Sequence, residues 1–260
     1  MRKLMLAFAF AFACQAQQHD HGAAAPATAA PTPSIAHAGS SVKYGDANGY
    51  LSLPKAGGKK PAIIVIQEWW GLNDWVKQQS DRFASQGYVA LAADLYRGKV
   101  ATTMEEAHEL SRGLPEDRAI NDLKAAFKYL AARSDVDPKR IGVIGWCMGG
   151  GYSLGLALNE PRIAATVMNY GRLVSDPATI ARLKSPLMGN FGAEDRGIPA
   201  ADVKAFDAAL KKAGKSSDIK IYDGAGHAFM NETNKQGYKA DAAADAQKRN
   251  DAFFASHLRG

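Results

Sequence analysis

Short runs of apolar residues recur along the chain and alternate with stretches whose apolar residues are spaced as on one face of a helix. The run at 61–68, PAIIVIQE, has a continuous Ile and Val content, which predicts a strand buried on both faces. The strands predicted from such runs are 61–68, 88–96, 140–146, 163–171, 185–192 and 218–224. Six short strands at this spacing indicate a sheet-based domain rather than a helical bundle.

The stretches between these runs predict the helices. The helix at 75–87 stops at Gly87, and two helical pieces within 104–133 are separated near Pro115, which suits a first helical turn. Further helices are expected at 149–159, 198–214 and 242–258. Strands that alternate with helices predict an α/β protein with a mostly parallel central sheet and helices on both faces.

The beginning of the chain differs from this pattern. Residues 1–16 combine a basic start with a short apolar run, the layout of a signal peptide. The AFAC stretch ending at Cys14 resembles the box at which bacterial lipoproteins are cut and lipidated, and cleavage near Ala16 is the alternative. Residues 17–40 are rich in Ala and Pro and read as a disordered tether, which leaves 41–260 as one domain. We therefore expect an exported protein, either periplasmic or tethered to the membrane by a lipid anchor at Cys14.

Charge and cysteine content narrow the possible functions. The formal net charge is +6, but no basic run with interleaved aromatic residues is present, so we expect no nucleic-acid partner. The chain has two cysteines, and Cys14 lies in the leader. The domain therefore has a single thiol, Cys147, and cannot form an internal disulfide. A lone thiol in an exported domain favours a chemical role for it.

The surroundings of Cys147 support such a role. The sequence IGVIGWCMGGGYS at 141–153 places Cys147 after an apolar run and before a glycine-rich helix start. The spacing Gly145-x-Cys147-x-Gly149 is the nucleophile-elbow pattern, with cysteine in the place of serine. The alternative is a buried cysteine at a tight turn between strand and helix.

Five chemically capable residues lie at or just past predicted strand ends: Glu68, Arg97, Cys147, Asp195 and His227. The carboxyl ends of parallel strands share one edge of the sheet, so these residues are expected near one site. The order nucleophile, acid, histidine is that of α/β-hydrolases, with gaps of 48 and 32 residues.

Two of these assignments have alternatives in the sequence. Asp195 would orient a histidine and stabilise its charged form, as in a catalytic triad. It is also placed to cap the helix that starts near Pro199, and Glu194 is the rival acid.

Six stretches in order resemble the dienelactone hydrolase family of α/β-hydrolases, whose members are carboxymethylenebutenolidase-like. They cover about 42–258: QEWWGLN (67–73), ADLYRG (93–98), GWCMGG (145–150), GAED (192–195), GAGHAF (224–229) and the closing AAADAQKRNDAFFASHL (242–258). The resemblance implies an α/β-hydrolase fold and hydrolysis of small-molecule carboxylic esters or lactones. It also implies a Cys-His-Asp triad with a thioester intermediate, and no metal or organic cofactor.

The resemblance also assigns roles to residues around the triad. Glu68 would contact the resting thiol and help to deprotonate it. The backbone amides of Trp69 and Met148 would form the oxyanion hole.

The substrate-binding residues are where the sequence departs from the family. Well-known members hold a substrate carboxylate with two arginines. Arg97 lies near the first position, whereas Met230 and Asn231 occupy the second. A carboxylate on the substrate is therefore in doubt. Trp70, Tyr96 and Phe229, together with Trp69, are expected to line a pocket for an apolar or aromatic group.

A different class of function also fits this scaffold. An intact α/β-hydrolase fold can serve as a non-catalytic binding protein at the cell surface, and a tether suits that role. The joint presence of Cys147, Asp195, His227 and Glu68 favours the enzyme. We expect the domain to be a monomer.

Overall fold

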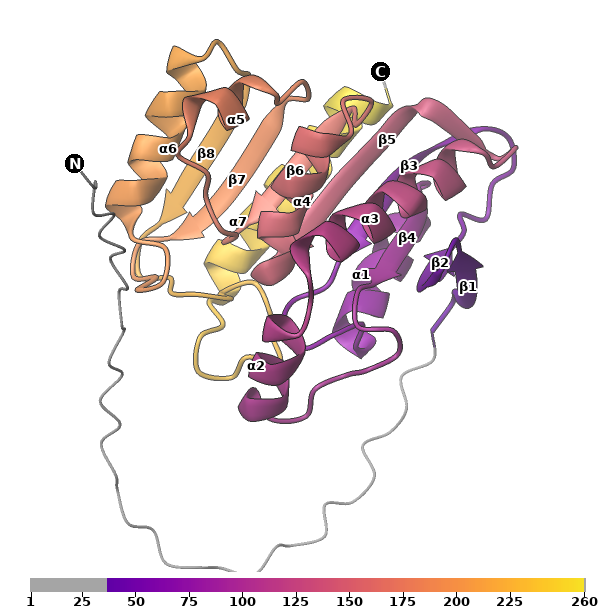
Figure 1. Ribbon diagram of the computed structural model, residues 1–260, viewed down its shortest axis with the longest axis horizontal. Helices are drawn as coiled ribbons and strands as arrows, with labels where there is room; N and C mark the ends of the chain where they lie inside the picture. The colour runs from indigo at the N-terminus through magenta and orange to yellow at the C-terminus, as the bar shows by residue number, and fades with distance from the viewer. Residues whose placement is uncertain (1–36, 260) are drawn as a thin grey trace, which may run out of the picture. The chain divides into compact units, whose positions relative to one another are not determined.

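An eight-stranded sheet forms the centre of the protein in the computed structural model, which describes residues 37–259 (Figure 1). The strand order is β1-β2-β4-β3-β5-β6-β7-β8, and all neighbouring pairs from β4 onward along this order are parallel. The strands are β1 Ser40–Tyr44, β2 Ala47–Ser52, β3 Lys60–Ile66, β4 Val89–Asp94, β5 Val136–Trp146, β6 Ala165–Asn169, β7 Leu187–Gly192 and β8 Ser217–Tyr222. The expected α/β class with a mostly parallel sheet is confirmed.

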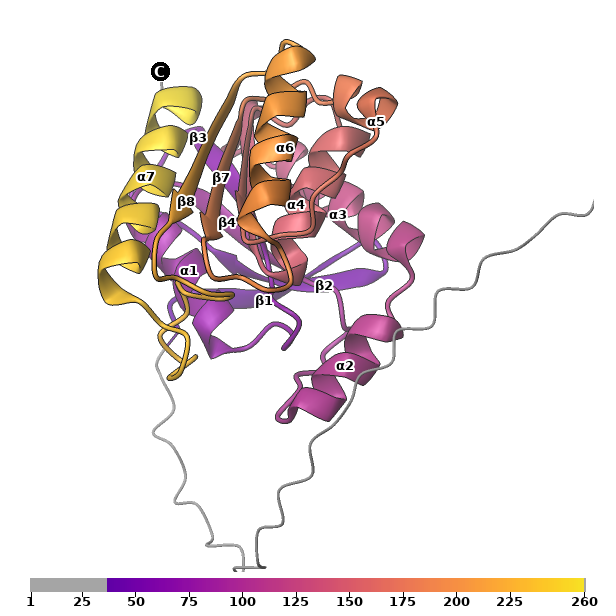
Figure 2. The ribbon, with the colours of Figure 1, turned by 90° about the vertical axis from the view of Figure 1, so that its left-hand side faces the viewer.

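Helices cover both faces of the sheet. Figure 2 shows α1 and α7 on one face and α3, α4, α5 and α6 on the other. The helices are α1 Asp74–Ser85, α2 Met104–Arg112, α3 Glu116–Ala131, α4 Met148–Asn159, α5 Pro177–Ala181, α6 Ala200–Lys212 and α7 Ala240–Leu258. The six predicted strands and the predicted helices are present, with ends that differ by a few residues.

Three elements were not predicted: β1, β2 and the short helix α5. The strands β1 and β2 pair antiparallel with each other, and β2 pairs antiparallel with β4 at the edge of the sheet. Most of β1 is solvent-exposed, so its sequence SSVKY lacks the apolar run used to find the buried strands. A polar edge strand carries little hydrophobic signal.

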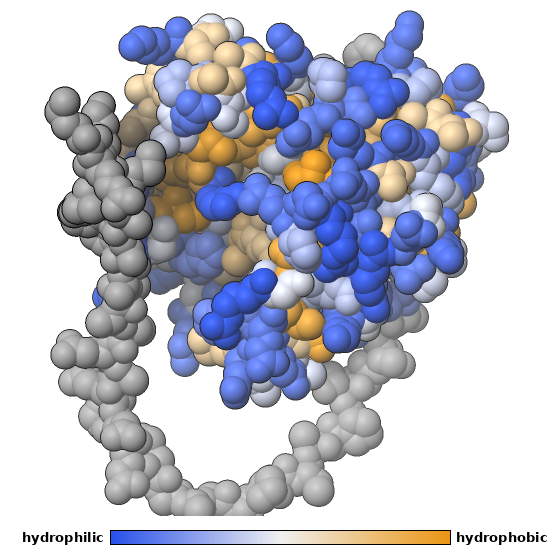
Figure 3. Space-filling model, in the orientation of Figure 1, coloured by the Kyte–Doolittle hydropathy of each residue, from blue (hydrophilic) through white to orange (hydrophobic). Residues whose placement is uncertain are grey.

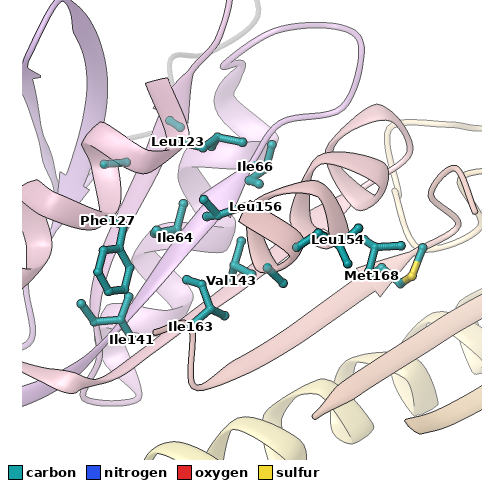
Figure 4. Packing of buried hydrophobic residues seen from close by; sticks show 14 of the residues in the cluster. Ile64, Ile66, Leu123, Phe127, Ile141, Val143, Leu154, Leu156, Ile163 and Met168 are labelled. Carbon is teal, nitrogen blue, oxygen red and sulfur yellow. The ribbon is translucent and has the colours of Figure 1, made fainter. Parts of the chain in front are cut away.

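Two hydrophobic layers lie on either side of the sheet because successive residues of a strand point to opposite faces. Ile64 and Ile66 of β3 pack under α3 and α4, as Figure 4 shows. Ile63 and Val65 of the same strand pack under α1 and α7. Each such fully buried side chain contributes roughly 1.5–3 kcal/mol to stability. This sandwich fixes the positions of the strand ends.

The helix α2 begins with a well-formed cap. Thr103 accepts a hydrogen bond from the amide of Glu106, and the Glu106 carboxylate accepts one from the amide of Thr103. This is a capping box, which satisfies two backbone donors at the start of the helix. Within residues 37–259, no helix is both long enough and apolar enough to cross a bilayer.

Candidate active site

A sharp turn between β5 and α4 presents Cys147. The backbone of Cys147 has φ 54° and ψ −119°, a conformation that non-glycine residues rarely adopt. Glycines make the turn possible: a Cβ on Gly145 would collide with the carbonyl of Gly149, and a Cβ on Gly149 would collide with the carbonyls of Ile66 and Gln67. The strand-turn-helix geometry is that of a nucleophile elbow. Cys147 is a free, half-buried cysteine.

The start of α4 is arranged to stabilise negative charge at this point. Cys147 is the N-cap residue of the 12-residue helix, and no side chain caps the helix. The first N–H groups of a helix and its dipole favour an anion there, including a thiolate. The amide of Cys147 donates to the carbonyl of Asn169 at 3.1 Å and ties the turn to β6.

The amides of Trp69 and Met148 flank Cys147. Within residues 37–259, neither amide donates a hydrogen bond to a protein group. Both residues line the cavity above Cys147. The ring of Trp69 is held from two sides, with centroids 4.8 Å from His108 and 5.2 Å from Trp70. Two free donors beside a nucleophile are what an oxyanion hole requires.

Asp195 and His227 come from the loops after β7 and β8. His227 Nδ1 lies 2.6 Å from Asp195 Oδ2, and Asp195 is buried at 4% exposure. The other carboxylate oxygen of Asp195 accepts from the amides of Gly197 and Ile198. Asp195 does not cap α6, whose N-cap residue is Pro199. The rival Glu194 is exposed.

The contacts of His227 favour its protonated form. Burial acts to lower the pKa of His227, but hydrogen bonds to Asp195 and Cys147 and their charges outweigh it and raise the pKa to about 10. Burial acts to raise the pKa of Asp195, and the hydrogen bond and charge of His227 hold it below its usual value. The imidazolium so favoured lies beside the Cys147 sulfur. A positive charge there stabilises a thiolate.

Glu68 follows β3 and is buried at 2% exposure in the wall of the same site. Its Oε2 accepts from the Asn231 side-chain amide at 2.7 Å, and its Oε1 accepts from the Tyr170 hydroxyl at 3.4 Å. Burial raises the pKa of Glu68 to about 7, opposed by these hydrogen bonds and by the charge of His227. Within the described residues, no hydrogen bond joins Glu68 to Cys147.

Two residues of this wall were not assigned roles from the sequence. Tyr170 has a positive φ of 39°, is fully buried, and its ring lies edge-on to His227 with centroids 5.3 Å apart. Met230 and Asn231 stand where the family resemblance placed an arginine, and Asn231 donates a hydrogen bond to Glu68. The signal for Tyr170 was its place at the end of the strand predicted at 163–171.

The predicted substrate residues are distributed differently. Trp70 lines a cavity at the site. The Tyr96 hydroxyl donates to Met148 Sδ at 3.2 Å, so Tyr96 supports the residue next to the nucleophile. Phe229 is fully buried between the rings of Tyr170 and Tyr222, beneath the site. Tyr96, Phe229 and Arg97 do not line either of the two cavities at the site.

The side chain of Arg97 is bound to Asp122 of α3. Its Nη2 donates to both carboxylate oxygens of Asp122 at 2.8 and 2.9 Å. Arg97 itself has a positive φ of 57° in the turn after β4, which directs the side chain. The structure therefore does not bring Arg97 to the triad residues.

Two cavities meet at Cys147, Trp69 and His227. The larger has a volume of about 910 Å³ and extends toward α6, with Tyr170 in its wall. The smaller has a volume of about 640 Å³ and is lined by Glu68, Trp70 and the loop around 231–236. Within residues 37–259, no group of three His, Cys, Asp or Glu side chains is placed to hold a metal ion.

A parallel sheet, a strained cysteine turn and a histidine bound to a buried aspartate define the class of α/β-hydrolases. The family model described as the dienelactone hydrolase family matches residues 47–258. The chain belongs to this family, whose members are hydrolases of carboxylic esters and lactones.

Individual relatives agree with this assignment. A protein of Methylorubrum extorquens whose name assigns it to the carboxymethylenebutenolidases is 34% identical over 219 residues, covering 79% of this chain and 75% of that protein. A protein of Bradyrhizobium whose name describes a 2-oxo-3-(5-oxofuran-2-ylidene)propanoate lactonase is 30% identical over 224 residues, covering 81% and 90%.

A solved structure supports the fold as well. It comes from Klebsiella pneumoniae, is described as a dienelactone hydrolase, and has a TM-score of 0.77 at 28% identity, covering 85% of this chain and 99% of that one. The expectation of an enzyme is confirmed at the level of a dienelactone hydrolase-like hydrolase. These comparisons do not favour a non-catalytic binding protein.

Proposed function

We propose that the chain hydrolyses carboxylic esters or lactones through Cys147, His227 and Asp195, by way of a thioester on Cys147. The observation that carries this proposal is the contact of 2.6 Å between His227 and Asp195, at a site where His227 and the elbow cysteine Cys147 line the same two cavities. A site without catalytic activity would not need a charged histidine beside a strained thiol.

In the first half of the reaction, the thiolate sulfur attacks the carbonyl carbon and forms a C–S bond. The carbonyl electron pair moves onto oxygen, which accepts hydrogen bonds from the amides of Trp69 and Met148. Each such donor is typically worth about 3 kcal/mol in the transition state. Collapse breaks the C–O bond, and His227 Nε2 gives its proton to the leaving oxygen. For a lactone, the freed hydroxyl stays attached to the acyl group.

In the second half, neutral His227 takes a proton from water as the water oxygen attacks the thioester carbon. The tetrahedral intermediate then expels the thiolate and leaves the carboxylic acid. Asp195 keeps the Nδ1–H of His227 oriented throughout, as the acid of a triad does. This cycle restores the thiolate–imidazolium pair.

Glu68 is proposed to poise the thiol. It shares the smaller cavity with Cys147 and His227, and its pKa of about 7 suits proton exchange near neutral pH. Its carboxylate also interacts with the charge on His227.

We propose that the substrate needs no carboxylate. Arg97 is bound to Asp122, and Asn231 stands at the second arginine position and is bound to Glu68. A bidentate clamp for a carboxylate is therefore not assembled from these two positions.

The deciding experiment is turnover of p-nitrophenyl acetate by the purified domain and by Cys147→Ala. We expect turnover by the wild type and loss of at least a thousandfold in the variant. The acyl-enzyme should be visible by intact mass spectrometry as an acetyl group on Cys147 when His227→Ala is mixed with the ester. Wild-type turnover by Cys147→Ala would refute the mechanism, and no ester or lactone turnover by the wild type would favour the binding-protein alternative.

A further inference from the structure

We propose that the larger cavity is a subsite for a neutral, apolar substituent of the substrate, and that the small side chain of Ala205 in α6 leaves room for a long one. The inference rests on the proposed function and names the class of substrate: esters with an extended alkyl or aryl group on one side of the scissile bond.

The lining of this cavity is mostly apolar side chains that are left partly exposed. Leu173 and Val174 follow β6, Ile198 lies in the Asp195 loop, and Met148 lies next to the nucleophile. Figure 3 shows hydrophobic side chains gathered in a hollow beside α6 on this face of the molecule. A concave apolar surface that opens at a nucleophile is typical of a substrate pocket.

One face of α6 closes the cavity. Asp202, Ala205, Phe206 and Ala209 line it, at the spacing i, i+3, i+4 and i+7 that places residues on one side of a helix. Phe206 is buried and forms part of the floor, whereas Ala205 is exposed to the cavity with only a methyl group. Alanine at this position leaves space that a larger residue would fill.

The charged side chains around this cavity offer no unpaired cation away from the nucleophile. Apart from His227, Arg172 is the one cation among the lining residues, and it donates to Glu116 at 3.1 Å. Asp202 also lines the cavity and contributes a negative charge. An anionic substituent would meet an arginine already paired with Glu116 and an acid, whereas an alkyl chain would displace water from apolar side chains.

The smaller cavity is lined by a different set of side chains. They include Glu68, Asn231, Thr233, Asn234, Lys235 and Gln236, although most of the exposed surface is apolar, as in the larger cavity. The two sides of the scissile bond therefore meet different residues, since both cavities open at Cys147 and His227.

The test uses two ester series. In the first, p-nitrophenyl esters lengthen from acetate to hexanoate, and in the second, acetates of 1-alkanols lengthen from ethanol to hexanol. Only one of the two series places its growing chain in the larger cavity. Which series does so depends on which side of the scissile bond faces α6. In one series the wild-type kcat/KM should rise by about threefold to fourfold per added methylene until the cavity is filled.

The variants are Ala205→Phe and a matched control, Ala208→Phe. Both alanines are exposed on α6, but Ala208 does not line the cavity. Ala205→Phe should lower the ratio of long-chain to short-chain kcat/KM by about tenfold in the responding series, and Ala208→Phe should leave that ratio unchanged. An unchanged ratio for Ala205→Phe in both series would overturn the inference.

Binding to Cys147→Ala separates this inference from the mechanism. Calorimetry with ethyl hexanoate and with monoethyl adipate, which replaces the terminal methyl by a carboxylate, should show tighter binding of the neutral ester. Ala205→Phe in the same background should weaken it. If the ester mechanism fails but this binding pattern holds, the subsite stands without the proposed chemistry. Tighter binding of the anionic ester would overturn the neutral-substituent assignment.

Discussion

The side-chain amide of Asn231 donates a hydrogen bond of 2.7 Å to Glu68, whose carboxyl group is 2% exposed beside the candidate nucleophile. The contact stabilises the ionised form of a group whose pKa burial raises to about 7.

We expect Asn231→Ala to raise the pKa of Glu68 further, because the charged form loses its strongest hydrogen bond. If ionised Glu68 is needed for turnover, the acidic limb of the kcat/KM profile should move to higher pH in this variant. Measurement of kcat/KM for p-nitrophenyl acetate from pH 5 to 9 tests this. The profile of Glu68→Gln should lack this acidic limb. If the limb of Asn231→Ala has the same apparent pKa as that of the wild type, Glu68 is not the group that causes it.

Glu68 also predicts how stability depends on pH. A carboxyl group whose pKa rises from 4.5 unfolded to about 7 folded binds more protons in the folded state. Its contribution is fully present below pH 4.5 and is lost as the pH rises through 7, by about 3 kcal/mol. Glu68→Gln should therefore be stabilised relative to the wild type at pH 8 but not at pH 4.5. Urea unfolding at the two pH values measures the difference, and equal effects at both would contradict the assigned pKa.

Removal of the Asp195 charge should impair catalysis at neutral pH. Asp195→Asn loses the interaction that raises the pKa of His227, so the imidazolium becomes less favoured at pH 7. The amide also disturbs the orientation of the ring, and we expect kcat to fall by about a hundredfold to ten-thousandfold. Glu194→Gln, one residue away and exposed, is the control and should stay within about twofold of the wild type. A larger loss of kcat in Glu194→Gln than in Asp195→Asn would instead identify Glu194 as the acid of the triad.

The elbow glycines offer a paired stability test. A Cβ on Gly149 would collide with backbone carbonyls of β3 and the residue after it, which cannot move without disturbing the sheet. Gly149→Ala should therefore destabilise the fold by several kcal/mol, beyond the 1–3 kcal/mol typical of overpacking, and lower turnover. In Gly155→Ala the new methyl meets the end of the flexible Ile120 side chain at 3.0 Å. That variant should be neutral or stabilised by up to about 1 kcal/mol through helix propensity. Thermal unfolding of the two variants provides the comparison.

We expect Arg97 to contribute to the folding stability of the domain and not to substrate binding. Its partner Asp122 has a side chain only 10% exposed, and Arg118 lies farther from it, at 3.8 Å. Arg97→Gln should cost about 1–3 kcal/mol of unfolding free energy, because a buried carboxylate loses its closest cation. The ratio of KM values for esters with and without a carboxylate should not change. A selective rise in KM for the carboxylate-bearing ester would instead place Arg97 at the substrate, as the family resemblance implied.

Export remains a proposal from the leader, since residues 1–36 lie outside the described part of the chain. If Cys14 is the lipidation site, the expressed full chain should fractionate with membranes, and Cys14→Ser should release it into the soluble periplasmic fraction. A soluble wild-type protein whose mature N-terminus lies near residue 17 would favour simple signal cleavage.

The fold class was predictable because buried parallel strands require continuous apolar runs, and β3, β4 and β5 have them. The edge strand β1 was missed because a strand that faces solvent needs no such run, and β2 was missed because its sequence ANGYLS is buried but contains no continuous apolar run. The elbow was predictable because glycine at 145 and 149 is a steric requirement of the turn. The partners of Glu68 were not predictable, since Tyr170 and Asn231 lie 102 and 163 residues away along the chain.

The sequence by itself determined the alternation of strands and helices, the cysteine turn and the order of the candidate triad. Each of these depends on local patterning and on short-range sterics. Only the tertiary structure decided that Arg97 binds Asp122, that Asp195 and not Glu194 reaches His227, and that two cavities meet at Cys147. Such pairings depend on side-chain direction after the sheet has brought remote loops together. Neither residue type nor spacing encodes that direction.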